Sequence, residues 1–357
     1  MEEKRAWAEV DLSAARRNFE SIGWMAGVPV IAVVKANAYG HGAVPLGRLY
    51  EALGALRLAV ATLGEARALR RGGIRLPILI LGAVPPLPDA AREMAKEGLI
   101  PAVVSLAHGE ALSSAAERAG VCLPVDLKVD TGMGRLGVLP QEAEAVPALF
   151  GKGALRPLGI FTHFYSGADP AATLSQCRVF DDFRARLRAR GVEFPLCHGA
   201  ATAALPHGFA RYGAVRVGLG LYGYAPVGGL SPILRLFARC VHIKDVPRGA
   251  TLSYGGFRAP RAMRVATVSI GYGDGFCPPS GAVLTVGGAP CPVLGRVCMD
   301  MTLLDVSAAN VSLWDAVPLG TWAEGEDVYR ALTGIRARVE RIYTENGSFS
   351  QKREKNP

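Results

Sequence analysis

Short β-branched runs alternate with segments of helical period from Pro29 to Tyr224, and this alternation constrains the fold more than any other feature. The eight runs are Val30–Val34, Leu58–Thr62, Ile78–Leu81, Ile100–Val104, Leu123–Val129, Leu158–Thr162, Glu193–Leu196 and Ala214–Val217. Eight βα repeats within ~220 residues predict an α/β fold of the parallel (β/α)8, TIM-type barrel class, with an open doubly wound sheet as the alternative.

The segments between the runs are rich in Ala and Arg and carry apolar residues at helical spacing. They include Glu65–Arg71, Asp89–Glu97, Leu106–Arg118, Gln141–Phe150 and Leu174–Arg190. We therefore expect one helix after most of the strands.

The pattern changes after Tyr224, where the turn-rich segment PVGGLSP is followed by short alternating runs punctuated by Gly and Pro. These runs are Leu234–Ile243, Arg264–Ile270, Ala282–Val286, Pro292–Val297 and Thr302–Val306. We expect a barrel over residues 1–228, a smaller mostly-β domain over 229–343, and a polar tail over 344–357.

Composition excludes several classes of protein. With 50% hydrophobic and 20% charged residues the chain is too apolar to be disordered. No stretch approaches the ~18 uninterrupted apolar residues of a membrane span, and the start MEEKRAWAEV lacks the apolar region of a signal peptide. A soluble, cytoplasmic protein without a membrane partner is therefore expected.

The net charge of +9 raises the question of nucleic acid, but the basic residues are spread along the chain rather than gathered in short Lys/Arg-rich tracts. We expect no nucleic-acid partner. The seven cysteines are odd in number and widely spaced, which fits neither a disulfide framework nor a zinc ribbon. No metal site is expected.

Cations and imidazoles stand where the predicted strands end, which is where barrel enzymes place their catalytic groups. In chain order they are Lys35, Lys128 with Arg135 just beyond it, His163, His198 and Arg216. A lysine among apolar strand residues is costly to bury in its charged form, and burial lowers its pKa. A lysine of lowered pKa is what Schiff-base chemistry requires.

The segment VVKANAYGHG (33–42) resembles the lysine loop of the pyridoxal-phosphate-dependent alanine racemases, a family of fold type III. Similar blocks recur in the family's order: VDLKVDTGMGRLG (125–137), FTHF (161–164), VRVGL (215–219), LSYG (252–255), IGYGDGF (270–276) and GRVCMDM (295–301). The resemblance covers residues 5–343. It implies a barrel followed by a β domain, pyridoxal 5'-phosphate as cofactor, and a homodimer with shared active sites.

The resemblance also implies roles around the cofactor. Lys35 would hold pyridoxal phosphate as a Schiff base, and Arg216 would donate to the pyridine nitrogen. His163 and His198 would orient Arg216 and the ring. The phosphate would be held by Tyr39, Thr202, Tyr329 and the backbone amides of Gly218 and Leu219.

For the reaction, the resemblance implies interconversion of L-alanine and D-alanine, the latter for bacterial peptidoglycan. Lys35 would exchange the α-proton on one face, and Tyr254 of the partner chain on the other. Arg135 and the amide around Met299 would hold the substrate carboxylate. Three further residues would support the site: Lys128, as a carbamate that steadies Arg135; Asp300, beside Met299; and Tyr272, along the substrate path.

Two other functions are compatible with such a fold. A broad-specificity racemase or an amino-acid decarboxylase would use the same barrel, but decarboxylases of this type pair the ring nitrogen with an acid, which Arg216 is not. A non-catalytic pyridoxal-phosphate carrier would be a single barrel without the domain that bears Tyr254. We interpret Cys298 as a structural residue.

Overall fold

The structure is a computed structural model that describes residues 4–151, 153–225, 227–319, 327–345 and 348–349. By its packing, the chain divides into two compact units. The barrel unit contains Ala15–Ala38 and Ala43–Ser231. The β unit contains the described residues of Met1–Ala14, Tyr39–Gly42 and Pro232–Pro357.

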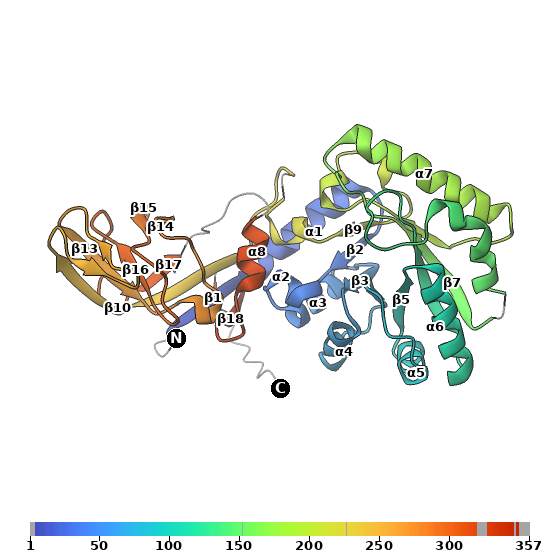
Figure 1. Ribbon diagram of the computed structural model, residues 1–357, viewed down its shortest axis with the longest axis horizontal. Coiled ribbons are helices and arrows are strands. Elements are labelled where there is room, and N and C mark those ends of the chain that lie inside the picture. Colours follow the sequence, from blue (N-terminus) through green and yellow to red (C-terminus); the bar gives the residue numbers. More distant parts are fainter. Residues whose placement is uncertain (1–3, 152, 226, 320–326, 346–347, 350–357) are drawn as a thin grey trace. The chain divides into compact units, whose positions relative to one another are not determined.

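Eight parallel strands form the sheet of the barrel unit, in the order β8-β7-β6-β5-β4-β3-β2-β9 (Figure 1). They are β2 (Val30–Val33), β3 (Arg57–Val60), β4 (Ile78–Ile80), β5 (Leu99–Val103), β6 (Leu123–Lys128), β7 (Leu155–Phe161), β8 (Leu196–His198) and β9 (Val215–Val217). A parallel bridge between His198 and Ala214 links the two ends of this order, so the barrel is nearly closed. The predicted fold class is confirmed.

The helices of this region are α1 (Leu12–Ala26), α2 (Lys35–Tyr39), α3 (Ala43–Ala52), α4 (Leu63–Arg71), α5 (Pro88–Lys96), α6 (Leu106–Ala119) and α7 (Pro170–Arg188). Short 3-10 turns are η1 (Pro140–Leu149), η2 (Thr202–Ala204), η3 (Gly208–Ala210) and η4 (Leu219–Tyr222). Side-chain caps start several helices: Thr62 and Glu65 form a capping box on α4, and Ser105 and Asp169 cap α6 and α7.

Two elements of the barrel unit differ from the sequence-based expectation. The segment expected as a helix over Gln141–Phe150 is 3-10, because Pro147 inside it has no backbone N–H to donate. The seventh strand begins at Leu196, where the expected run Glu193–Leu196 ends. That run lies mostly in the loop before the strand.

The β unit is built on a seven-stranded sheet of order β16-β13-β10-β1-β18-β19, with β17 also paired to β10. Its strands are β1 (Ala6–Asp11), β10 (Leu234–Val246), β13 (Met263–Val268), β16 (Thr302–Asp305), β17 (Ala316–Leu319), β18 (Glu340–Glu345) and β19 (Ser348–Phe349). Two small hairpins accompany it, β11 (Thr251–Leu252) with β12 (Phe257–Arg258) and β14 (Val283–Val286) with β15 (Ala289–Pro292). The remaining elements are η5 (Tyr272–Asp274) and α8 (Asp327–Gly334).

Both ends of the described chain enter this sheet. Strand β1 pairs antiparallel with β10 and parallel with β18, so residues 6–11 belong to the β unit rather than to the expected barrel of 1–228. Strand β18 continues through Thr344 and Glu345, which the sequence analysis assigned to the tail. Among the described residues, no helix is long and apolar enough to cross a membrane.

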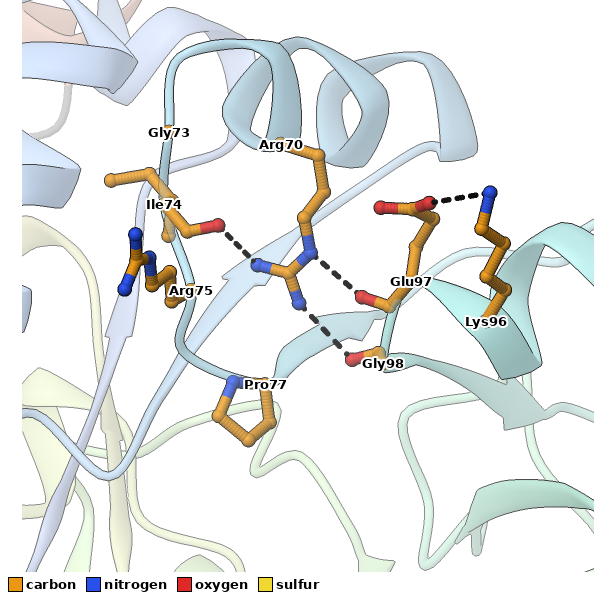
Figure 2. A pocket seen from close by; sticks show the side chains of 8 residues that line it. All are labelled: Arg70, Gly73, Ile74, Arg75, Pro77, Lys96, Glu97 and Gly98. Atoms are coloured by element: carbon orange, nitrogen blue, oxygen red, sulfur yellow. Dashed lines mark hydrogen bonds and ion pairs between the residues drawn. The ribbon is translucent and has the colours of Figure 1, made fainter.

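A surface pocket of about 520 Å³ lies at the amino ends of β4 and β5 (Figure 2). Arg70 stands at its centre and donates to the carbonyl oxygens of Glu97 (2.7 Å), Ile74 (2.8 Å) and Gly98 (3.3 Å). Because its guanidinium is used to join the loops before these two strands, we interpret Arg70 as a structural clamp.

Candidate active site

Lys35 stands just beyond the carboxyl end of β2, at the start of an unusual turn. Residues Ala36 to Tyr39 all have φ between 51° and 53°, which makes α2 a left-handed turn built without glycine. This conformation costs non-glycine residues about 1–2 kcal/mol each. Two side chains hold it in place: Glu65 accepts from the amide of Ala36 (2.6 Å), and Asn37 accepts from the amide of Ala43 (2.8 Å).

Four cationic side chains meet at this end of the barrel: Lys35 after β2, Lys128 on β6, Arg135 in the loop after β6, and Arg216 on β9. Burial, followed by the charges of Arg135 and Arg216, lowers the pKa of Lys35. The same three causes lower the pKa of Lys128, which is buried on β6, to about 8. The four side chains therefore lie within electrostatic reach of one another, and the site favours an anionic ligand.

Arg216 is held at the carboxyl end of the barrel by two histidines. It donates to Nδ1 of His198 (2.7 Å), to Nδ1 of His163 (3.1 Å) and to the carbonyl oxygen of Thr162 (2.9 Å). Burial is the main cause that lowers the pKa of His163 to about 3 and that of His198 to about 4. Both imidazoles are thus neutral near pH 7, and each accepts from the guanidinium.

Arg135 comes from the loop that follows β6. The Asp130 carboxylate orders this loop by accepting from the amides of Gly132 and Gly134, both at 3.0 Å. Arg135 itself is exposed. Its charge is close enough to lower the pKa values of both lysines.

A second group of polar atoms follows β8 and β9. The buried hydroxyl of Thr202 accepts from the amide of Gly220 at 3.1 Å, which ties η2 to the start of η4. Gly218 and Leu219 lie at that same start. This arrangement brings a hydroxyl and consecutive backbone amides together, a donor set suited to a phosphate.

Besides Tyr39 and Tyr329, the β unit carries four predicted site residues. Tyr254, Tyr272 and Met299 are exposed, at 68%, 44% and 52% of their surface. The amide of Tyr272 donates to the Cys298 carbonyl (3.0 Å), so these loops lie side by side. Asp300 accepts from Arg338 at 2.7 Å.

The two remaining predicted phosphate ligands belong to the β unit. Tyr39 is the last residue of α2 and is grouped with the β unit. Tyr329 belongs to α8, and its side chain lies outside the described residues.

Sequence reasoning missed the charged pair beneath Arg216. Arg57 on β3 donates to both carboxylate oxygens of Asp126 on β6, at 3.1 and 2.9 Å, and Asp126 in turn contacts Nε2 of His198 at 3.2 Å. A signal for Asp126 did exist: it precedes Lys128 by two residues on one strand, and residues two apart share a face.

The residues present fit pyridoxal phosphate. The barrel unit offers a lysine of lowered pKa for the carbonyl carbon and a permanently protonated arginine. For a phosphate it offers the hydroxyl of Thr202 and the backbone amides of Gly218 and Leu219. The fold and these groups define a barrel enzyme whose site takes an anionic, carbonyl-bearing ligand.

Comparison with known proteins gives the family. Residues 10–226 match the model of the alanine racemase N-terminal domain, and residues 233–343 match that of the alanine racemase C-terminal domain. The alanine racemase of Desulfovibrio desulfuricans is 38% identical, over 96% of this chain and 99% of that protein. The chain belongs to the alanine racemase family, whose members are pyridoxal-phosphate-dependent isomerases.

Solved structures agree with this assignment. The alanine racemase of Clostridium difficile 630 superposes with a TM-score of 0.89 at 30% identity, covering 98% of both chains. The Bacillus anthracis alanine racemase with bound L-Ala-P gives a TM-score of 0.87 at 31% identity, covering 98% of this chain and 97% of that one. The resemblance inferred from the sequence is confirmed.

Proposed function

We propose that this protein is an alanine racemase that interconverts L-alanine and D-alanine with pyridoxal 5'-phosphate by two-base proton transfer. The observation that carries the proposal is the position of Lys35: its amine has a lowered pKa and lies within electrostatic reach of Arg216, which two neutral histidines hold. Family membership supports the choice of alanine, since relatives over nearly the whole chain bear that name.

The cofactor, when bound, supplies an electron-withdrawing ring that acidifies the α-proton of an attached amino acid. Lys35 would hold the carbonyl carbon of the cofactor and, with its amine free, would accept or return the α-proton. Its lowered pKa makes the neutral, proton-accepting amine more abundant near pH 7 than in an ordinary lysine.

Arg216 donates a hydrogen bond to the ring nitrogen without giving up a proton, because a guanidinium stays charged at all working pH values. By donating there, Arg216 would keep the ring nitrogen unprotonated and would weaken the electron withdrawal that the cofactor supplies. Arg216 would thereby disfavour long-lived negative charge at the α-carbon, which suits a racemase because side reactions need such charge to persist. It also disfavours the decarboxylase alternative.

For the rest of the site we propose the roles implied by the family. Thr202, Gly218, Leu219, Tyr39 and Tyr329 hold the phosphate. Arg135, steadied by a carbamate on Lys128, binds the substrate carboxylate together with the amide around Met299. The pKa of about 8 supports the carbamate, because only a neutral amine reacts with carbon dioxide.

The second base is Tyr254 of a partner chain in a homodimer, and the exposed Tyr254, Tyr272 and Met299 on neighbouring loops provide an apolar surface for that contact. Asp300 secures these loops through Arg338, and Tyr272 lines the substrate path. We place the enzyme in the cytoplasm, where D-alanine enters peptidoglycan precursors.

The proposed reaction is tested by circular dichroism of L-alanine incubated with the cofactor-loaded enzyme. The signal should decay to zero as the racemic mixture forms. Lys35→Ala should abolish the decay and the visible absorbance of the bound cofactor, while Lys96→Ala, at the opposite end of the barrel, should alter neither. A loaded wild-type enzyme that leaves the optical signal of L-alanine constant would refute the proposed function.

The shared site is tested by complementation. Lys35→Ala and Tyr254→Phe chains, each inactive alone, should recover activity when mixed, because heterodimers contain one site with both wild-type groups. Subunit exchange is followed separately with differently tagged chains. Exchange without recovered activity would mean that Tyr254 does not act across the dimer.

A further inference from the structure

A charged layer crosses the interior of the barrel beneath Arg216. Arg57, Asp126 and His198 come from β3, β6 and β8, and their side chains are 8%, 0% and 0% exposed. Arg57 donates to both oxygens of Asp126, and Oδ2 of Asp126 also lies 3.2 Å from Nε2 of His198. The interior of such a barrel is usually filled by branched apolar side chains, so charges here need an explanation.

Both contacts of His198 select the same position for its ring proton. The Arg216 guanidinium can only donate, so Nδ1 of His198, at 2.7 Å, must accept. The proton is therefore on Nε2, where it is donated to Asp126. A neutral imidazole has one proton, and the acid on one side and the arginine on the other determine which nitrogen carries it.

Neighbouring residues leave room for the Asp126 carboxylate and hold the plane of the His198 ring in one orientation. A Cβ atom on Gly159 of β7 would lie 2.5–2.6 Å from the carboxylate atoms of Asp126, so only glycine admits the acid there. Phe161, on the same strand, stacks on His198 with ring centroids 4.9 Å apart and planes 8° apart. The Arg216 guanidinium carbon lies 5.0 Å from the centre of the same phenyl ring.

We propose that Arg57 and Asp126 are positioning residues that fix His198 in the Nε2–H form and thereby set the orientation of the Arg216 guanidinium. Arg57 places an opposite charge beside the buried Asp126 carboxylate and fixes the direction of that carboxylate. Asp126 holds the imidazole proton, and the Nδ1 lone pair that remains holds Arg216. The last step, from Arg216 to the cofactor ring, rests on the proposed function.

The first test reads the ring proton directly and needs no activity. The protein is labelled with 15N-histidine, and the signal of His198, one of six histidines, is identified by its loss in His198→Gln. In the wild-type protein Nε2 should show the shift of a protonated nitrogen and Nδ1 that of an unprotonated one, with and without pyridoxal phosphate. A proton found on Nδ1, or on both nitrogens, at neutral pH would overturn the proposal.

The second test removes the acceptor. In Asp126→Asn the new amide can donate to Nε2, so His198 should move its proton toward Nδ1, where it opposes Arg216. We expect weaker cofactor binding and a kcat about tenfold or more lower, with a smaller change in KM, by analogy with the loss seen when the hydrogen-bond partner of a metal ligand is removed. Gly159→Ala, which crowds the carboxylate, should shift the same 15N signals.

The matched control is Gly23→Ala on α1, where a Cβ meets nothing within 4 Å. It should change neither the 15N signals nor cofactor affinity. If Asp126→Asn does not fold, the wild-type signals still decide the proposal. An Asp126→Asn protein with unchanged His198 signals and unchanged cofactor affinity would refute it. A wild-type enzyme that failed to racemise alanine would refute the proposed function and leave the 15N result standing.

Discussion

The hydrogen bond from Tyr222 to strand β2 allows a test of how much one buried contact stabilises the end of the barrel that carries Lys35. The Tyr222 hydroxyl is buried and donates to the Val33 carbonyl oxygen at 2.7 Å, two residues before Lys35. Tyr222→Phe keeps the ring and removes the donor. A buried hydrogen bond contributes about 1 kcal/mol, and an acceptor left without its partner costs about 1–3 kcal/mol, so we expect a loss of about 1–2 kcal/mol.

The same substitution at Tyr50 provides the control. Tyr50 is fully buried and stacks on Phe19, with ring centroids 5.6 Å apart, but its hydroxyl has no hydrogen-bond partner among the described residues. Tyr50→Phe therefore removes a desolvated group that gains nothing in the folded state. We expect it to be neutral or to stabilise the protein by up to about 1 kcal/mol.

The assay is urea unfolding of the two cofactor-loaded variants and the wild type, followed by circular dichroism. The free energies of unfolding are compared provided that the three m-values agree. Tyr222→Phe should also weaken cofactor binding, because Val33 fixes the strand end that carries Lys35, whereas Tyr50→Phe should not. Equal free-energy losses in the two variants, or a larger loss at Tyr50, would contradict the hydrogen-bond reasoning.

Two further predictions concern the opposite end of the barrel and the carbamate. Arg70→Ala should lower the free energy of unfolding by about 2 kcal/mol, because three carbonyls lose a charged donor, while the exposed Arg71→Ala should stay within about 0.5 kcal/mol of wild type. Lys128, whose pKa of about 8 is below that of an ordinary lysine, should be half neutral near pH 8. With 13C-bicarbonate at that pH one carbamate resonance should appear, fade on acidification toward pH 6, and be missing in Lys128→Arg; a resonance that survives in the variant would assign the modification elsewhere.

Much of the fold could be predicted because local sequence determines it. Seven of the eight barrel strands overlap the expected runs over most of their length, since each run is apolar, β-branched and bounded by turn residues. Strand β1 could not be placed in this way. Its partners β10 and β18 follow it by more than two hundred residues, and no local pattern encodes such a pairing.

The sequence predicted the positions of several site residues but not the charged pair beneath them. Polar residues at the ends of apolar runs gave Lys35, His163, His198 and Arg216 from position alone, and the structure brings His163 and His198 onto Arg216. The roles of these residues toward the cofactor stay predictions. Arg57 immediately precedes the expected run Leu58–Thr62, and a charged residue at the edge of an apolar run is usually interpreted as an exposed residue where the strand begins. Arg57 reaches Asp126 only because the curved sheet brings the side chains of β3 and β6 together inside the barrel, where both are buried.

In the left-handed turn after Lys35, the usual effect of replacing alanine by glycine on stability is reversed. In a right-handed helix, glycine destabilises relative to alanine by about 1 kcal/mol, whereas at positive φ the methyl group is the liability. Ala36 and Ala38 are therefore positions where removing a side-chain atom should relieve the backbone. A glycine at either position should stabilise the protein, but it would also give the backbone beside the reactive amine more conformations to occupy. The loop next to Lys35 is thus a place where thermostability and preorganisation would be selected in opposite directions.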